Sequence, residues 1–335
     1  MIMKRWKNEM LVRVVMPFVS VFLFFATVEL FLRVIHFEEV TFSPSGVFQA
    51  FLGKPTDSQM VNGDVLRDAE LFWRMNPKRD DDGIWSQGFR EIKTYPIEKP
   101  VDILRIVCLG DSVPYGIGVS VYESYPKILE KILNYMFWQK IEVVNAGMPG
   151  YSSFQCLRYL KRDLLKYQPD LLLVHVGPND RAAAVYFADK EQPRSPQWIV
   201  DMQNTLGRFQ TYSLLSRIIF YFRYKFWTKP LMKPRVSFED YRKNLADIVE
   251  LGRNNGFQII FLPSLRKDKK GLYQLLPLPE KSMAVDSLRV FQENQKNAPL
   301  FLDECHLTVS GNQLMANTIA EFLLKNNLLT KKRYS

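Results

Sequence analysis

The segment RIVCLGDSVPYG (residues 105–116) decides the fold of this chain of 335 residues. Its first half is an apolar run rich in β-branched residues, which is typical of a buried β-strand. The run stops at Gly110, Asp111 and Ser112, and a proline and a glycine follow, so the strand ends in a tight turn. A serine at such a place is commonly a helix N-cap, but beyond the carboxyl end of a strand it can also be a nucleophile.

The same pattern repeats along the chain after residue 100, where apolar runs alternate with amphipathic segments. The strand-like runs are residues 105–111, 141–147, 170–177 and 257–264. The helical segments are residues 122–136, 152–168, 238–256 and 311–327. Continuous apolar strands separated by helices predict βαβ units and a parallel sheet covered on both faces. We therefore expect an α/β fold, a three-layer α/β/α sandwich, over residues 101–330.

An insertion interrupts this alternation between about residues 181 and 238. It includes YSLLSRIIFYFRYKFWTK, in which large apolar and aromatic residues are mixed with Arg217, Arg223, Lys225 and Lys229. One interpretation is a helix packed on the body of the domain, with its basic residues solvated, because aromatic stripes usually belong to a core. The other is a lid or a membrane-surface helix, since basic and aromatic residues together are typical of helices at a lipid interface.

An apolar run near the N-terminus, residues 14–35, is long enough to cross a membrane. It has about 22 residues, and about 20 are needed to span a bilayer as a helix. Glu29 and Arg33 interrupt it near its far end, at a spacing that lets them pair on one helix face. Because FVSVFLFFATV is apolar on all sides, the run indicates a transmembrane helix rather than an amphipathic helix on a soluble surface.

The charges around this run predict its orientation. The basic residues that precede it are Lys4, Arg5, Lys7 and Arg13. Glu38 and Glu39 follow it, so we expect a cytoplasmic N-terminus and an extracytoplasmic remainder, on the periplasmic or outer side of the cell membrane. No small-residue cleavage site follows the apolar core, which favours an uncleaved single-pass signal anchor over a cleaved signal peptide.

These observations divide the chain into three parts. Residues 1–36 form the cytoplasmic N-terminus and anchor, residues 37–100 a linker and lead-in segment, and residues 101–330 the α/β domain. The lead-in is rich in proline, glycine, aspartate and aromatic residues, and ELFWRMNP and GIWSQGFRE are its short packed pieces.

The composition limits the class of partner. The net charge is +10, but lysine and arginine are scattered and no zinc-finger or RNA-binding signature accompanies them. This favours attraction to anionic lipid or glycan and argues against nucleic acid. Three cysteines make a sparse, odd set, which argues against a disulfide-stapled fold. The sequence indicates no oligomeric state.

Three further motifs, in addition to Ser112, lie where ligands bind in an open parallel sheet, beyond strand ends or in the loop before the last helix. Gly147 in NAGMPGYS lets a backbone N–H approach a ligand without a side chain in the way. Asn179 in HVGPND offers a side-chain amide to a developing oxyanion. The last motif, DECHLTVSGN, contains Asp303 and His306, and His306 is the candidate general base because the other histidines lie beside the membrane and in a core strand.

A hydroxyl nucleophile needs a base, a group that orients the base, and donors for the oxyanion. The five residues at these four places fill all of these roles, in this order along the chain: Ser112, Gly147, Asn179, Asp303 and His306. The combination therefore favours Ser112 as a nucleophile over a cap.

The motifs GDSVPYG, NAG, GPND and DECH resemble the four blocks of the SGNH hydrolases, also called the GDSL-like esterase and lipase family. The resemblance spans about residues 105–326. It implies a flavodoxin-like fold and ester hydrolysis without metal or organic cofactor. It also implies that Ser112 is both nucleophile and first oxyanion donor, that Gly147 and Asn179 are the other donors, and that Asp303 orients His306.

We therefore expect a membrane-anchored serine esterase that acts on an acyl ester of a cell-envelope polysaccharide or lipid, by hydrolysis or by acyl transfer. The alternative is a membrane-tethered glycan-binding or scaffold protein on the same fold with idle catalytic residues. A nucleotide-binding fold is disfavoured, because GIGVS begins a glycine fingerprint without completing it. The G-x-S-x-G elbow of α/β-hydrolases is absent, since Val113 and Pro114 follow Ser112.

Overall fold

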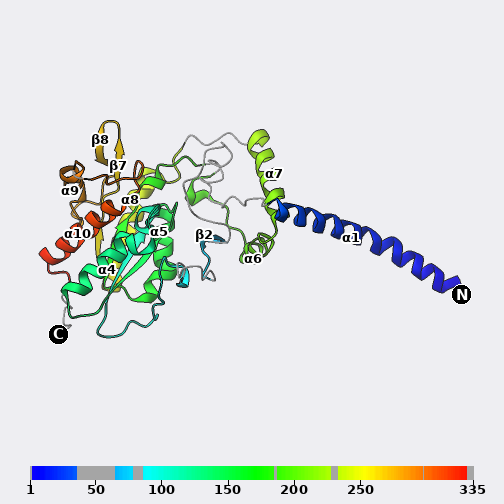
Figure 1. Cartoon of the computed structure of the whole chain (residues 1–335), viewed down its shortest axis with the longest axis horizontal. Helices are drawn as coiled ribbons and strands as arrows, with labels where there is room; N and C mark the ends of the chain where they lie inside the picture. Colours follow the sequence, from blue (N-terminus) through cyan, green and yellow to red (C-terminus); the bar gives the residue numbers. More distant parts are fainter. Residues whose placement is uncertain are drawn as a thin grey trace.

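The computed structural model describes residues 2–35, 65–77, 86–184, 187–227, 233–296 and 298–329. In Figure 1, helix α1 (Ile2–Val34) extends away from the body of the molecule, and helices α6 (Gln197–Leu206) and α7 (Gln210–Trp227) lie between α1 and that body. Some sequence expectations lie outside the described residues: those for most of the linker before residue 65, the start of GIWSQGFRE, His36, Glu38, Glu39 and Lys229.

A four-stranded parallel sheet forms the centre of the body. Its strands are β3 (Leu104–Gly110), β4 (Ile141–Gly147), β5 (Leu171–His175) and β6 (Gln258–Phe261). The strand order is β4-β3-β5-β6, so β3 lies between β4 and β5. The predicted parallel sheet is confirmed. Gly110 at the end of β3 is in register with Gly147 of β4 and His175 of β5, so three strands end at the same edge.

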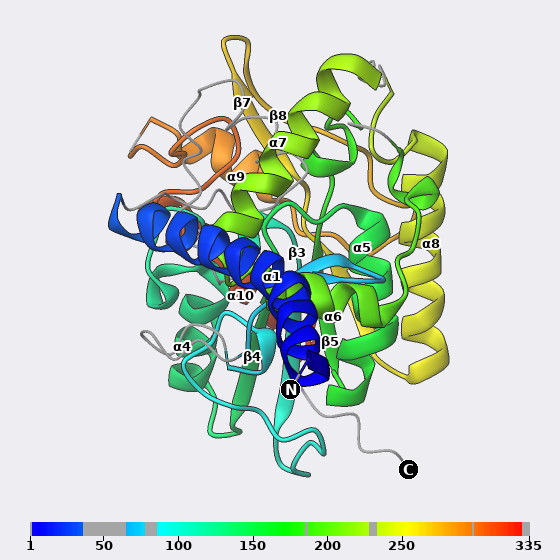
Figure 2. The same cartoon turned by 90° about the vertical axis from the view of Figure 1, so that its right-hand side faces the viewer.

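Helices cover both faces of the sheet, as Figure 2 shows. One layer contains α4 (Tyr125–Met136), α9 (Ser287–Asn294) and α10 (Val309–Lys325), and the other α5 (Ser153–Tyr159) and α8 (Phe238–Asn255). Alternate residues of β3 enter the two cores: Ile106 and Cys108 pack in the first, Val107 and Leu109 in the second. This is the pattern of a strand buried on both faces, and the predicted three-layer sandwich is confirmed.

The structure differs from the sequence expectation in its shortest elements. Two antiparallel hairpins were not expected, β1 (Val65–Asp68) with β2 (Phe72–Met75), and β7 (Leu265–Asp268) with β8 (Gly271–Gln274). Strands of four residues are too short for a clear alternation of apolar and polar residues. The helical segment 152–168 is also not uniform, because a π-helical turn (Leu160–Leu164) and a 3₁₀ turn (Leu165–Tyr167) follow α5.

Short helical turns complete the described part of the chain. They are α3 (Ser112–Tyr115) and the 3₁₀ segments η2 (Ser86–Gly88), η3 (Val121–Glu123), η6 (Pro178–Asp180) and η7 (Asp189–Glu191).

Two backbone hydrogen bonds join the start and the end of the insertion after Asp180. The backbone N–H of Arg235 donates to the carbonyl of Ala182 (2.8 Å), and that of Val236 donates to the carbonyl of Asp180 (3.1 Å). Farther out, α7 contacts α1, and its apolar residues are largely exposed. The expectation that this helix packs on the body of the domain is therefore not met.

Helix α1 contains the predicted apolar span. Among the described residues, it is the one helix long and apolar enough to cross a membrane, over Arg13–Val34. Glu29 and Arg33 form the expected pair, with 2.9 Å between Oε1 and Nε.

A buried ion pair ties β3 to β4. Arg105 is fully buried, and its guanidinium donates two hydrogen bonds to Oε2 of Glu142 (2.8 and 2.9 Å). A third bond reaches the carbonyl of Tyr167 (2.7 Å). Removal of one partner leaves the other charge buried without compensation.

We therefore predict that Glu142→Gln lowers the free energy of unfolding by about 3–5 kcal/mol. Chemical denaturation of the full chain in detergent measures this change. Glu98→Gln, a substitution of the same chemistry at an exposed position, is the control and should change stability by less than about 0.5 kcal/mol. A loss at Glu142 no larger than at Glu98 would contradict the prediction.

Candidate active site

Ser112 is the first residue of α3, directly beyond the end of β3. It does not cap this helix. The N-cap is Asp111, whose Oδ1 accepts a hydrogen bond from the backbone N–H of Val113 (3.0 Å). The Ser112 hydroxyl instead lies 2.8 Å from Nε2 of His306. Its side chain is therefore directed at the predicted base, and the capping role belongs to its neighbour.

The backbones around Ser112 approach each other closely because two strands end in glycine. A Cβ atom at Gly147 would lie 2.2 Å from the backbone nitrogen of Tyr115, and one at Gly110 would lie 2.3 Å from the carbonyl oxygen of His175. Real Cβ atoms do not tolerate such contacts. Glycine at both positions thus lets α3 lie directly against the edge of the sheet.

His306 is held by Asp303 in the loop before α10. Nδ1 of His306 lies 2.5 Å from Oδ2 of Asp303. Oδ1 of Asp303 accepts hydrogen bonds from the backbone N–H groups of Cys305 and His306, both at 2.8 Å. These bonds form because the three residues are close in sequence, and they fix the carboxylate so that it orients the imidazole. Ser112, His306 and Asp303 thus form one continuous hydrogen-bonded chain.

The two partners shift each other's pKa in opposite directions. Partial burial works to raise the pKa of Asp303, but the hydrogen bonds from the side chain of His306 and from two backbone N–H groups outweigh it and hold that pKa well below its usual range. Burial works to lower the pKa of His306, but the hydrogen bond to Asp303 outweighs it and raises that pKa.

The groups predicted as oxyanion donors have different hydrogen-bond partners in the structure. The N–H of Gly147 donates to Oδ1 of Asn145 (3.0 Å), so it is engaged within the protein. By contrast, no described residue accepts a hydrogen bond from the N–H of Ser112 or of Gly150. Nδ2 of Asn179 donates one proton to the carbonyl of Tyr151 (3.1 Å), which places it against the Gly150 loop and leaves its second proton available.

The residue after Asn179 is Asp180, and its buried carboxylate is hydrogen-bonded to another element. Asp180 accepts hydrogen bonds from the hydroxyl and the backbone N–H of Ser153 at the start of α5, the latter at 3.0 Å. Asn244 of α8 donates to the same hydroxyl (2.9 Å). Burial raises the pKa of Asp180 to about 7. No role was assigned to this aspartate from the sequence, and its position next to Asn179 was the available signal.

One group of residues has the side chains for a metal site. The ligand atoms of Asp303, Cys305 and His306 all lie within 4.8 Å of one another. Two of these residues already form the hydrogen-bonded chain with Ser112, so a cation bound there would compete with it.

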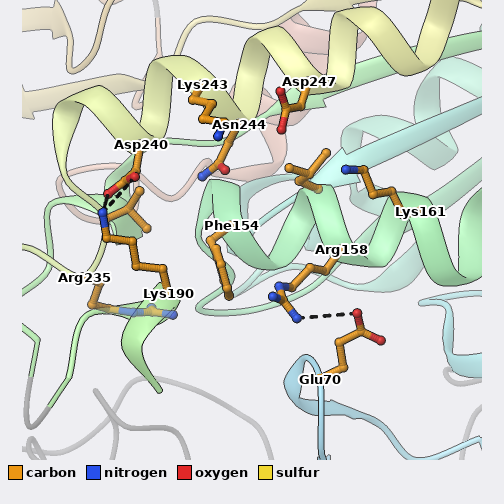
Figure 3. A pocket seen from close by; sticks show the side chains of 12 residues that line it. Glu70, Phe154, Arg158, Lys161, Lys190, Arg235, Asp240, Lys243, Asn244 and Asp247 are labelled. Atoms are coloured by element: carbon orange, nitrogen blue, oxygen red, sulfur yellow. Dashed lines mark hydrogen bonds and ion pairs between the residues drawn. The ribbon is translucent and has the colours of Figure 1, made fainter. Parts of the chain in front are cut away.

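A separate hollow of about 380 Å³ lies between α5 and α8 (Figure 3). It contains none of the predicted site residues. Three of its cationic side chains lie beside carboxylates: Arg158 lies 3.5 Å from Glu70, Lys190 2.8 Å from Asp240, and Arg235 2.9 Å from Asp189. The candidate active site is therefore the open edge of the sheet, not this hollow.

Comparison with known proteins identifies the family of this chain. The sequence profile of the GDSL-like lipase/acylhydrolase family matches residues 108–314, which include every predicted site residue. The chain belongs to this family. Two curated esterases are also similar: an acetylxylan esterase of Xylanibacter ruminicola (30% identical over 93 residues) and an arylesterase of Vibrio mimicus (30% over 76 residues). These matches span 27% and 23% of this chain, and only 19% and 38% of those relatives.

Solved structures of two esterases or lipases are similar at low sequence identity. The lipase/acylhydrolase of Enterococcus faecalis is 17% identical, with a TM-score of 0.41 over 67% of this chain and 96% of that one. The acetylxylan esterase Axe2 of Geobacillus stearothermophilus is 15% identical, with a TM-score of 0.42 over 66% of this chain and 94% of that one.

Proposed function

We propose that this chain is a membrane-anchored serine esterase that hydrolyses or transfers an acyl ester. The observation that carries the proposal is the continuous chain of hydrogen bonds from the Ser112 hydroxyl through His306 to Asp303. A hydroxyl in contact with an oriented imidazole is the arrangement that acyl transfer through a serine requires. Membership of the GDSL-like lipase/acylhydrolase family supports the same chemistry.

In the proposed reaction, Nε2 of His306 removes the proton of Ser112 as the serine oxygen attacks the acyl carbon. Asp303 holds the imidazole in the correct tautomer and stabilises the imidazolium. His306 then gives the proton to the leaving alcohol, and an acyl-serine remains. Water or a sugar hydroxyl attacks this ester, again with His306 as base, which releases the free acid or a new ester and restores Ser112.

The tetrahedral oxyanion would be held by three donors: the N–H of Ser112, the N–H of Gly150 and the second amide proton of Asn179. Gly150 replaces Gly147 in this proposal, because the Gly147 N–H already donates to Asn145. Gly150 adopts φ +80°, a conformation that favours glycine, and the next residue accepts the first proton of Asn179. The three donors therefore come from three neighbouring strand ends.

We further propose that the substrate is an acyl ester of a cell-envelope glycan or lipid on the extracytoplasmic side. The apolar span of α1 supports anchoring in the membrane, and the charges on its two sides support this orientation. Both curated relatives are named as esterases, one of them for acetylxylan.

A single experiment tests for esterase chemistry and distinguishes hydrolysis from acyl transfer. The full chain in detergent is incubated with acyl esters of increasing chain length, with and without an added polysaccharide, and the products are identified by mass spectrometry. Free acid alone indicates hydrolysis, and an acylated polysaccharide indicates transfer. A fluorophosphonate probe reports whether Ser112 is activated. No turnover and no labelling would favour the alternative of an idle binding or scaffold protein.

Asn179→Ala is expected to lower kcat for a short acyl ester about 10²- to 10³-fold, because one oxyanion donor is lost. KM should change little, since the donor acts on charge that develops in the transition state. Asn255→Ala, the same substitution at an exposed position of α8, is the control. Unchanged kcat in a folded Asn179→Ala variant would remove Asn179 from the proposed site.

A further inference from the structure

Helix α7 presents an exposed apolar stripe. Its members are between 43% and 64% exposed: Leu215, Ile218, Ile219, Phe222 and Phe226. Their spacing of three, four, seven and eleven residues from the first places them on one face of the helix. Contiguous apolar surface of this kind is uncommon on soluble proteins and marks an interaction site.

The start of α7 is fixed to the membrane helix α1. The carboxylate of Glu29 in α1 accepts hydrogen bonds from the backbone N–H groups of Gln210 and Thr211 (3.1 and 2.9 Å), and from the Thr211 hydroxyl (2.7 Å). A carboxylate at this place satisfies the free N–H groups of the helix and complements its dipole. The charged residue that interrupts the apolar span therefore joins α1 to α7.

The hydrogen bonds between Glu29 and the start of α7 determine how deep α7 would lie in a bilayer. Glu29 lies five residues before Val34, where the apolar span ends, so it is about 7.5 Å inside that end along the helix. In Figures 1 and 2, α7 runs across the direction of α1 rather than along it. When α1 crosses a bilayer, α7 consequently lies along its surface, at the depth where hydrocarbon meets headgroups.

We propose that α7 is an interfacial helix that lies in the lipid surface where α1 leaves the membrane, with its apolar stripe toward the acyl chains. Amphipathic helices with aromatic and basic residues bind bilayers in this way. Lys225 lies 3.2 Å from the Tyr221 hydroxyl, beside the stripe, where both side chains can reach headgroups. The proposal rests on the membrane anchoring proposed above.

The neighbouring helix α6 connects this surface to the body. Trp198 and Met202 of α6 are exposed one turn apart. Asn204 of the same helix is bonded through its side chain to the backbone of Arg67 in β1, in both directions (2.8 and 3.1 Å). The two ends of the insertion are hydrogen-bonded near Asp180, next to Asn179, so in this proposal contact of α7 with lipid holds the domain near the membrane.

Photocrosslinking tests the proposal directly. The full chain carries p-benzoylphenylalanine in place of Phe222 and is reconstituted in nanodiscs of phosphatidylethanolamine and phosphatidylglycerol. Irradiation should give a lipid adduct detectable by mass spectrometry. The control position is Tyr135, which is 90% exposed and belongs to α4, and it should give none. Helix α4 lies on the side of the body away from α1 in Figure 1. No adduct at Phe222, or a crosslink to a second copy of the chain, would overturn the proposal.

A pair of substitutions tests whether the apolar stripe of α7 faces the lipid. With the photocrosslinker at Phe226, Ile219→Glu should lower the yield of lipid adduct at least about fivefold, since a buried charge is costly at this depth. Ser216→Glu adds the same charge off the stripe and should retain most of the yield. Equal yields in both variants would overturn the proposed orientation.

These experiments distinguish a failure of the α7 proposal from a failure of the proposed function. Failure of the chain to enter nanodiscs would overturn the anchoring together with the placement of α7. An inserted chain that gives no adduct would overturn only the placement of α7. Fluorophosphonate labelling of Ser112 reports the esterase chemistry in the same samples, independently of both.

Discussion

Ser112→Ala is expected to lower kcat for a short acyl ester by a factor of about 10⁴ to 10⁶, because loss of the nucleophile leaves only binding and oxyanion stabilisation. The hydroxyl that lies 2.8 Å from His306 would be gone, and no acyl-serine could form. The measurement is stopped-flow hydrolysis of a chromogenic ester, in which the burst of alcohol should disappear together with steady-state turnover. Fluorophosphonate labelling should be lost in parallel.

The matched control for this variant is Ser120→Ala. Ser120 is an exposed serine eight residues farther along the chain, and its replacement removes a hydroxyl without touching His306. It should keep turnover within about twofold of the unmodified chain. A burst of full amplitude in Ser112→Ala would exclude this serine as the nucleophile, whereas loss of activity in both variants would indicate a disturbed loop.

Asp303→Asn is expected to lower kcat about 10⁴-fold, the cost of losing the carboxylate that holds a catalytic histidine in its working tautomer. It should also move the acidic limb of the pH profile. Burial alone would lower the pKa of His306, but the hydrogen bond to Asp303 outweighs it and raises that pKa. Since the base acts only when neutral, activity in the unmodified chain should rise with pH through this raised pKa. Without the carboxylate the limb should move to lower pH.

The pH dependence of kcat/KM between about pH 5 and 11 measures this shift, because this range includes the pKa of His306, which is raised to about 10. Cys305→Ala is the control, because Sγ of Cys305 lies 3.9 Å from Nδ1 of His306 and is the other group beside the imidazole. This variant should keep most of kcat. A limb that stays in place in Asp303→Asn would mean that a group other than His306 is titrated.

The sequence predicts the sheet from local patterns. It predicts the Ser-His-Asp arrangement from separate motifs, although Ser112 and His306 are 194 positions apart. Strand β5, for example, begins with the continuous apolar run Leu171–Val174. The spacing of Asp303 and His306 already lets one orient the other in a single loop. By contrast, the oxyanion donor could not be chosen from sequence. Gly147 and Gly150 are equally permissive, and only the hydrogen bond from Gly147 to Asn145 distinguishes them.

Contacts between distant segments that no motif marks were beyond sequence reasoning. Glu29 was expected to pair with Arg33, and it does, but its bonds to the start of α7 join residues about 180 positions apart. Asp180 similarly reaches Ser153 of another element. Such contacts depend on how complete elements pack, and no local period encodes them.

The hydrogen bonds between the two ends of the insertion let changes within the insertion occur separately from changes at the active site. Because Ala182 and Arg235 are bonded across its neck, segments of different length or composition can be exchanged beyond that point without moving Asn179. Loops of this kind vary readily while the scaffold that carries them is retained. The segment between Ala182 and Arg235 can therefore change while the hydrogen-bonded chain of Ser112, His306 and Asp303 stays the same.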